Sequence, residues 1–138
     1  MRYRECAGGI VFRGEEVFLL ANDKKEWVFP KGVVRNADLP RKTATDRVLS
    51  EAGLKAEIVG EAGVTEYEFY SVSRKEPVHN RVRWFVMTSQ GEPEVDREQG
   101  FISGGWFHFE EAFNRVTYTQ DRELLQKAWE IYRESVKL

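Results

Sequence analysis

Cysteine and long apolar runs are scarce in this chain of 138 residues, and their scarcity excludes several classes of protein. A single cysteine cannot form an internal disulfide, so a disulfide scaffold is excluded and a reducing compartment is expected. No apolar run approaches the roughly 20 residues that a membrane-spanning helix requires. The first six residues are already rich in charge, which is not typical of a signal peptide. We therefore expect a cytoplasmic protein without a membrane partner.

An excess of one charge is also missing. The 21 Lys and Arg residues nearly balance the 23 Asp and Glu residues, which leaves a formal charge of -2. This charge provides no general attraction to long nucleic acids or anionic lipid. Hydrophobic residues make up 41% of the chain, enough for a buried core, and no repeat or linker marks a boundary. We expect one domain over residues 1–138.

Several common catalytic patterns are absent. No glycine-rich loop ends in Lys-Ser or Lys-Thr, so a phosphate loop of that kind is excluded. His79 and His108 have no second ligand at metal-binding spacing, and Ser103 lacks the Gly-x-Ser-x-Gly frame of a nucleophilic serine. Any chemistry must therefore come from another constellation.

The apolar pattern predicts strands interleaved with helices. Two runs at 6–12 and 16–21, separated by Arg13-Gly14-Glu15, predict a β-hairpin. Pro40 and the apolar positions that follow predict a helix over 39–52, ended by Gly53. Further strands are predicted at 27–30, 56–63, 64–73, 81–87 and 105–108, and further helices at 109–116 and 120–137. This order is typical of an α+β fold with a mixed sheet between helices.

One stretch carries more information than the rest. It begins at Trp27-Val-Phe-Pro-Lys-Gly32 and continues through Asp38 to Gly53-Leu54. In its spacing it resembles the motif of the Nudix hydrolases: a glycine, five residues, an acid, seven residues, then Arg-Glu-apolar-x-Glu-Glu-x-Gly-apolar. Within that superfamily the chain is most similar to the diadenosine polyphosphate hydrolases. The resemblance covers nearly the whole chain and implies a mixed sheet sandwiched between helices.

This chain lacks most of the glutamates on which the chemistry of the motif depends. Glutamates at i, i+3 and i+4 share one helix face, hold Mg²⁺ or Mn²⁺, and so place a metal that clamps a diphosphate and activates water. Here Arg47 stands at the first glutamate, Ser50 at the second and Asp46 at the motif arginine, so Glu51 alone keeps its identity. The resemblance thus implies Mg²⁺ or Mn²⁺ if the protein is active, no tightly bound metal, and Glu51 as the single remaining ligand.

The charge at position 47 decides what this departure implies. Arg47 and Glu51 are i, i+4 neighbours and should form an ion pair. A fixed guanidinium opposes metal binding, yet it is well shaped to hold a phosphate without metal. We therefore predict a phosphate or nucleotide phosphate near Lys31 and Arg47. Lys31 could equally be a solvated loop lysine.

Other candidate residues lie outside the motif. Arg81 and Arg83 alternate along a strand and could reach a polyphosphate together, although a solvated sheet face is an equal alternative. Tyr67 and Tyr70, with Phe69, could stack on a nucleobase or belong to the core. Glu98 is a weak candidate for a catalytic acid or base. The acids from Glu92 to Glu98 are otherwise expected to form a solubilising loop.

These residues support three functions. The first is binding of a nucleotide or polyphosphate with hydrolysis lost or weak. The second is an active, metal-dependent nucleoside or diadenosine polyphosphate pyrophosphohydrolase whose site is rearranged around Glu51, Asp38, Asp46 or Glu98. The third is an interaction domain without a ligand. Metal-independent stabilisation by a nucleotide would favour the first, and turnover with Mg²⁺ or Mn²⁺ the second.

Overall fold

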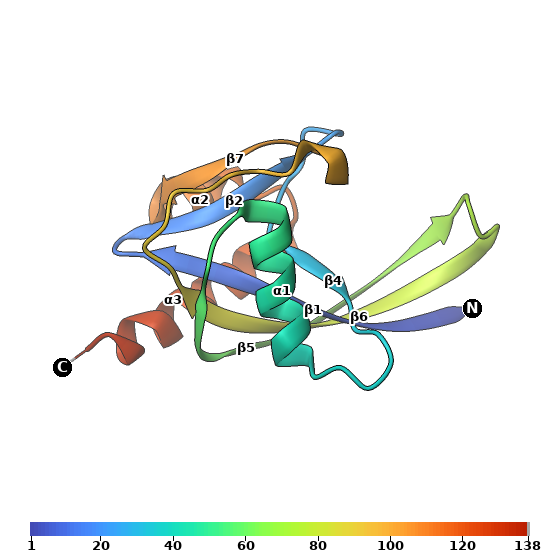
Figure 1. Cartoon of the computed structure of the whole chain (residues 1–138), viewed down its shortest axis with the longest axis horizontal. Coiled ribbons are helices and arrows are strands. Elements are labelled where there is room, and N and C mark those ends of the chain that lie inside the picture. Colours follow the sequence, from blue (N-terminus) through green and yellow to red (C-terminus); the bar gives the residue numbers. More distant parts are fainter. Residues whose placement is uncertain (138) are drawn as a thin grey trace.

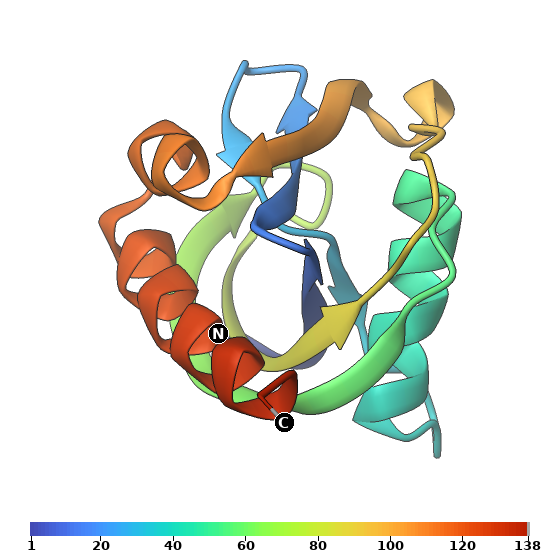
Figure 2. The same ribbon diagram turned by 90° about the vertical axis from the view of Figure 1, so that its left-hand side faces the viewer.

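The computed structural model describes residues 1–137, which form one curled mixed sheet with helices on both faces (Figures 1 and 2). The elements follow in the order β1 (Arg2–Arg13), β2 (Glu16–Asn22), β3 (Trp27–Val28), β4 (Lys31–Val33), α1 (Pro40–Ala52), β5 (Glu57–Ser71), β6 (Glu76–Thr88), η1 (Arg97–Gln99), β7 (Phe101–His108), α2 (Phe109–Arg115) and α3 (Thr119–Ser135). The expected α+β architecture, a mixed sheet sandwiched between helices, is confirmed.

The long strand β1 organises the sheet, whose main order is β3-β2-β1-β6-β5. β1 pairs in parallel with β6 along its length, and its other edge pairs antiparallel with β4 in its middle and with β2 at its end. β7 joins the sheet through β2. β5 and β6 form a hairpin that projects beyond the body of the domain beside the start of β1 (Figure 1).

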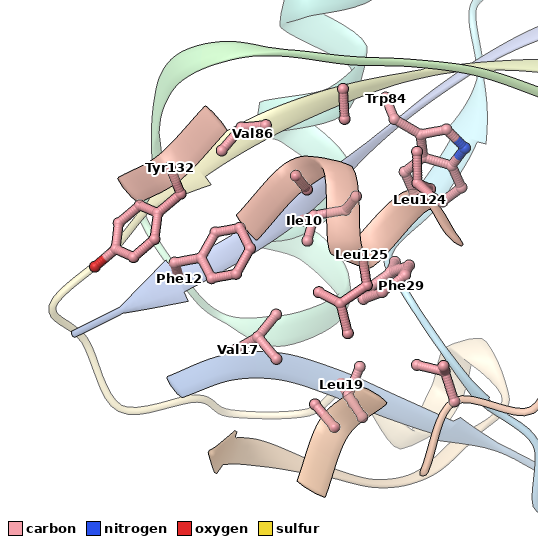
Figure 3. Close-up of a cluster of buried hydrophobic side chains, with 14 of the residues drawn as sticks. Ile10, Phe12, Val17, Leu19, Phe29, Trp84, Val86, Leu124, Leu125 and Tyr132 are labelled. Carbon is pink, nitrogen blue, oxygen red and sulfur yellow. The ribbon is translucent and has the colours of Figure 1, made fainter. Parts of the chain in front are cut away.

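Alternate side chains of β1 pack into two hydrophobic clusters, one on each face of the sheet. Ile10 and Phe12 face α2 and α3, and Figure 3 shows this cluster with Leu125 and Tyr132 of α3. Val11 points to the opposite face and packs with residues of α1. Because successive strand residues face opposite sides, one apolar strand supplies both cores. Figure 2 shows α1 on one side of the sheet and α2 and α3 on the other.

The predicted hairpin over 6–12 and 16–21 is confirmed as β1 and β2, which pair antiparallel around a turn where Gly14 has φ 59°. This left-handed conformation favours glycine. The strands predicted at 56–63 and 64–73 were wrong as two elements, because β5 is a single strand. Its register shifts near Gly60 and Gly63, so these glycines accommodate irregularities in one strand and do not end it.

Helix α1 matches the prediction of 39–52 to within one residue, and Gly53 ends it with φ 69° as its N–H donates to the Leu49 carbonyl. In the loop predicted over 92–98, Glu92, Glu94 and Glu98 are exposed as expected, and the segment also docks on the end of α1. The N–H of Asp96 donates to the Glu51 carbonyl at 3.0 Å, and Gln99 donates to the Ser50 carbonyl at 3.0 Å. These bonds satisfy carbonyls that a helix end leaves free.

The helices of residues 1–137 include none that is long and apolar enough to cross a membrane.

Candidate functional site

A cavity of about 520 Å³ opens where the ends of several strands meet α1 and the start of α3. We call it the inner cavity. Its aromatic lining consists of Phe29, Tyr67, Phe69, Trp84, Phe101 and Tyr118. Its charged lining consists of Lys31 together with Glu26, Glu51, Glu68 and Asp121. Flat apolar walls with a few polar groups are the usual features of a small-molecule site.

Glu51 reaches the inner cavity from the last turn of α1, with only 4% of its side chain exposed. One carboxylate oxygen, Oε1, is fully buried and has no hydrogen-bond partner within residues 1–137. Burial raises the pKa of Glu51 to about 7, although the charges of Arg47 and Lys31 act in the opposite direction. Glu51 therefore lines the cavity with a carboxyl group that changes charge near neutral pH and has one buried, unsatisfied oxygen.

The other oxygen of Glu51 is held by Arg47, as the sequence predicted. A guanidinium nitrogen of Arg47 lies 3.2 Å from Oε2 of Glu51, and its Nε donates to the Lys31 carbonyl at 3.4 Å. The side chain of Arg47 passes directly over Gly32, where an added Cβ would collide with it. A cation thus bridges α1 and β4 at the first carboxylate position of the helix motif.

The neighbouring positions add no carboxylate to this face. The hydroxyl of Ser50 donates to the Arg47 carbonyl at 3.3 Å, and Asp46 pairs with Lys42 at 2.6 Å. Among residues 1–137, no group of three or more His, Cys, Asp or Glu side chains is placed to hold a metal ion. Mg²⁺ requires several hard oxygen ligands, and α1 offers it one carboxylate paired with a guanidinium. The residues of α1 do not fit a divalent metal.

Lys31 is the one cation that lines the inner cavity within the described residues. Its position follows from the pairing of β4 with β1, in which Lys31 lies opposite Gly8. Its ammonium lies 5.5 Å from the centroid of the Tyr67 ring. Its charge lowers the pKa of both Glu51 and Asp121 against the larger effect of burial. The structure therefore brings Lys31, Glu51 and Tyr67 together around one space.

Three acids of the inner cavity were not singled out from the sequence. Tyr118 donates a short hydrogen bond to Glu26, which lowers the pKa of Glu26 and raises that of Tyr118 to about 12. Glu68 accepts a 3.0 Å hydrogen bond from His79. Asp121 lies in the first turn of α3, and burial raises its pKa to about 6. No spacing in the sequence connects these residues, since they come from different elements.

Other predicted site residues lie elsewhere. Arg81 and Arg83 share a face of β6 as expected, but neither lines the inner cavity. Successive strand residues point to opposite faces, and it is the next residue, Trp84, that lines the cavity. Tyr70 is 61% exposed on β5 and does not line the cavity. Glu98 is exposed on η1, where its N–H donates to Asp96, and it too is absent from the cavity wall.

Comparison with known proteins supports the sequence motif. A family model of the NUDIX domain matches residues 2–128. A Mycobacterium tuberculosis protein provisionally named mutator protein MutT4 is 26% identical over 105 residues, which are 76% of this chain and 42% of that protein. The chain therefore spans less than half the length of that curated relative.

Solved structures share the fold. A Caenorhabditis elegans Ap4A hydrolase aligns with a TM-score of 0.72 and 18% identity, over 95% of this chain and 98% of that chain. A Streptococcus suis ADP-ribose pyrophosphatase aligns with a TM-score of 0.72 and 15% identity, over 94% of this chain and 92% of that chain. At these identities the likeness concerns the fold alone.

Proposed function

Because the chain belongs to the NUDIX domain family, we propose that the inner cavity binds a nucleotide-type small molecule and that hydrolysis is weak or lost. Members of this family generally use Mg²⁺ or Mn²⁺. The observation that carries the proposal is the 3.2 Å ion pair between Arg47 and Glu51, which occupies the helix face where a metal would be needed.

The inner cavity has the chemistry that a nucleobase requires. Tyr67 and Phe69 line one side with ring centroids 6.1 Å apart, and aromatic rings stack favourably on any base. Glu51 presents an unsatisfied buried oxygen, and Asp121 presents a second, half-buried carboxyl group. These acceptors suit the N–H groups of a base, which would satisfy the orphaned oxygen of Glu51.

The phosphates of such a ligand would lie towards Lys31 and Arg47. Lys31 lines the cavity. Arg47 is not among the lining residues, but it donates to the Lys31 carbonyl and 42% of its side chain is exposed. A guanidinium and an ammonium can bind phosphate oxygens without a metal. Within this arrangement Lys31 and Arg47 position the phosphates, while the aromatic wall and the carboxyl groups orient the base.

A second function, metal-dependent hydrolysis by a rearranged site, is favoured by one observation. Glu51 lines the cavity and has a pKa near 7, which is suited to a general base. Two other acids of such a site are less suited to act as a base, since Asp46 is paired with Lys42 and Asp38 is exposed. We therefore place binding before hydrolysis.

Thermal unfolding with nucleotides, in EDTA and then with Mn²⁺, tests the proposal. We expect diadenosine tetraphosphate or ATP to raise the melting temperature equally in both conditions. Lys31→Gln should abolish this stabilisation, while Lys55→Gln, an exposed lysine outside the cavity, should leave it unchanged. Stabilisation that requires Mn²⁺, together with turnover, would favour the hydrolase. No stabilisation by any nucleotide would favour an interaction domain.

A further inference from the structure

A second hollow, of about 570 Å³, is lined by residues from the start of β1, from the β5–β6 hairpin and from the segment between β4 and α1. Figure 1 shows the projecting hairpin beside the start of β1. We call this second space the arginine hollow. Six arginines line it: Arg2, Arg4, Arg35, Arg74, Arg81 and Arg83. They come from β1, from the segment that follows β4, from the β5–β6 turn and from β6. Only the tertiary structure brings them together.

The arginine hollow is separate from the inner cavity. Arg81 and Arg83 alternate along β6 with Val82 and Trp84, and successive strand residues point to opposite faces. Trp84 lines the inner cavity, whereas Arg81 and Arg83 line the arginine hollow. The two spaces share no lining residue.

The charge of the arginine hollow is opposite to that of the chain. Its six arginines face two acids, Glu5 and Asp38, so its lining carries a formal charge of +4 in a chain of net charge -2. The net charge of the whole chain therefore conceals a concentrated positive site. Arg2 and Arg83 pair with Glu76 and Glu61, which lie outside the lining, so these two acids offset part of this charge.

Several of these guanidinium groups are free to bind. Among residues 1–137, Arg4, Arg35 and Arg74 have no carboxylate partner, and Arg4 donates to the Asn80 side chain. Arg81 reaches Glu5 only at 3.5 Å, and both of these side chains are about half exposed or more. Exposed ion pairs of this kind contribute little and exchange easily for a stronger anion.

Helix α1 adds to the positive potential, because its first residue, Pro40, also lines the arginine hollow. Leu39 provides no side-chain cap, and the first turn of α1 contains no acid. Arg41 and Lys42 stand in that turn, at the end of a helix where the peptide dipoles already place positive charge. A bound anion would offset this unfavourable arrangement.

We propose that the arginine hollow binds a phosphate chain at a site distinct from the inner cavity. Guanidinium groups bind phosphate oxygens in a bidentate manner, and a chain of several phosphoryl groups matches both the charge of the lining and its spread over four segments. Inorganic polyphosphate and the phosphate chain of a dinucleoside polyphosphate share this chemistry. The inference does not depend on what occupies the inner cavity.

Calorimetric titration with sodium tripolyphosphate, in EDTA and at low ionic strength, tests the site. The variant Arg35→Gln/Arg74→Gln removes two of the arginines that have no carboxylate partner, so it breaks no ion pair, and we expect its affinity to fall by about tenfold or more. The control variant Lys55→Gln/Lys137→Gln removes two exposed charges elsewhere, of which Lys137 has only a long 3.9 Å contact with Glu134, and it should bind like the wild type. Lys31→Gln should also retain the tripolyphosphate affinity, although it loses nucleotide binding at the inner cavity.

Competition by diadenosine tetraphosphate against tripolyphosphate distinguishes the sources. If the two ligands compete in the wild type but not in Arg35→Gln/Arg74→Gln, nucleoside-capped chains also enter the arginine hollow. If they do not compete in the wild type, only free chains enter it. An unchanged tripolyphosphate affinity in Arg35→Gln/Arg74→Gln, or an equal loss in Lys55→Gln/Lys137→Gln, would overturn the proposal. So would binding of single-stranded RNA by a protein that does not bind tripolyphosphate.

Discussion

Arg47 and Glu51 form an ion pair of 3.2 Å between one exposed and one buried partner, since 42% of the Arg47 side chain is accessible but only 4% of that of Glu51. The charge of Arg47 lowers the pKa of Glu51 by less than burial raises it, so this pKa is raised to about 7. Folding therefore places a carboxyl group that favours its neutral form at the centre of the candidate site.

The first prediction concerns stability and pH. The pKa of Glu51 is raised from 4.5 to about 7 on folding, so the folded state binds its proton more tightly than the unfolded state. The free energy of unfolding should therefore fall as the pH rises through this interval. Glu51→Gln cannot ionise, and it should be more stable than the wild type by up to about 3 kcal/mol at about pH 8, with the difference vanishing near pH 4.5.

Urea unfolding across this pH range measures the effect. Glu98→Gln, at an exposed position on η1, provides the matched control and should follow the wild type at every pH. A Glu51→Gln variant that is no more stable than the wild type at about pH 8 would show that the carboxylate is not destabilised by burial.

The second prediction concerns restoration of the metal-binding face. Arg47→Glu/Ser50→Glu would place three carboxylates at i, i+3 and i+4 with Glu51 and remove the guanidinium. We expect this variant to bind Mn²⁺ and to gain about 2.7 kcal/mol of stability when Mn²⁺ is present at a hundred times its dissociation constant. Arg47→Glu alone and Ser50→Glu alone should each gain much less than half of this stabilisation from Mn²⁺, because the three residues act as one unit.

Titration of Mn²⁺ monitored by electron paramagnetic resonance would measure the binding. Arg47→Gln/Ser50→Gln has similar side-chain size without the charge and should show none. If the double glutamate variant folds but binds no Mn²⁺, the face of α1 is not equivalent to the metal-bearing face of the family.

The third prediction concerns the aromatic wall of the inner cavity. Tyr67→Leu removes the ring, and it should lower the affinity for a nucleotide by about tenfold, since stacking contributes about 1–3 kcal/mol per base. Tyr67→Phe keeps the ring and loses only the hydroxyl that accepts from Asn80, so its affinity should stay close to that of the wild type. Equal losses in the two variants would indicate that the hydroxyl, and not stacking, matters.

The fourth prediction connects the sheet to the site. A Cβ at Gly8 would lie 2.5 Å from the Pro30 carbonyl oxygen and 2.8 Å from the Lys31 side chain, so alanine there must displace β4. Gly8→Ala should cost about 1–3 kcal/mol and weaken nucleotide binding through the shift of Lys31. Gly105→Ala, where nothing lies within 4 Å of the added Cβ, is the control for both unfolding and binding.

The local sequence predicted those features that depend on neighbouring residues. Apolar runs and the Gly14 turn predicted the β1–β2 hairpin, and Pro40 and Gly53 predicted the limits of α1. The helical spacing of Arg47 and Glu51 predicted their ion pair. The two-strand prediction for β5 was wrong because Gly60 and Gly63 resemble strand breaks in the sequence, while pairing with β6 carries the strand through them.

The sequence by itself determined that Arg47 and Ser50 share a face of α1 with Glu51, because identity and spacing along one helix require no other element. Only the tertiary structure decided what surrounds Glu51. Its burial, the approach of Lys31 and the nearby carboxyl of Asp121 come from three separate elements whose distance in the chain carries no signal. The same is true of the six arginines, which a balanced composition conceals until the parallel pairing of β1 with β6 gathers them.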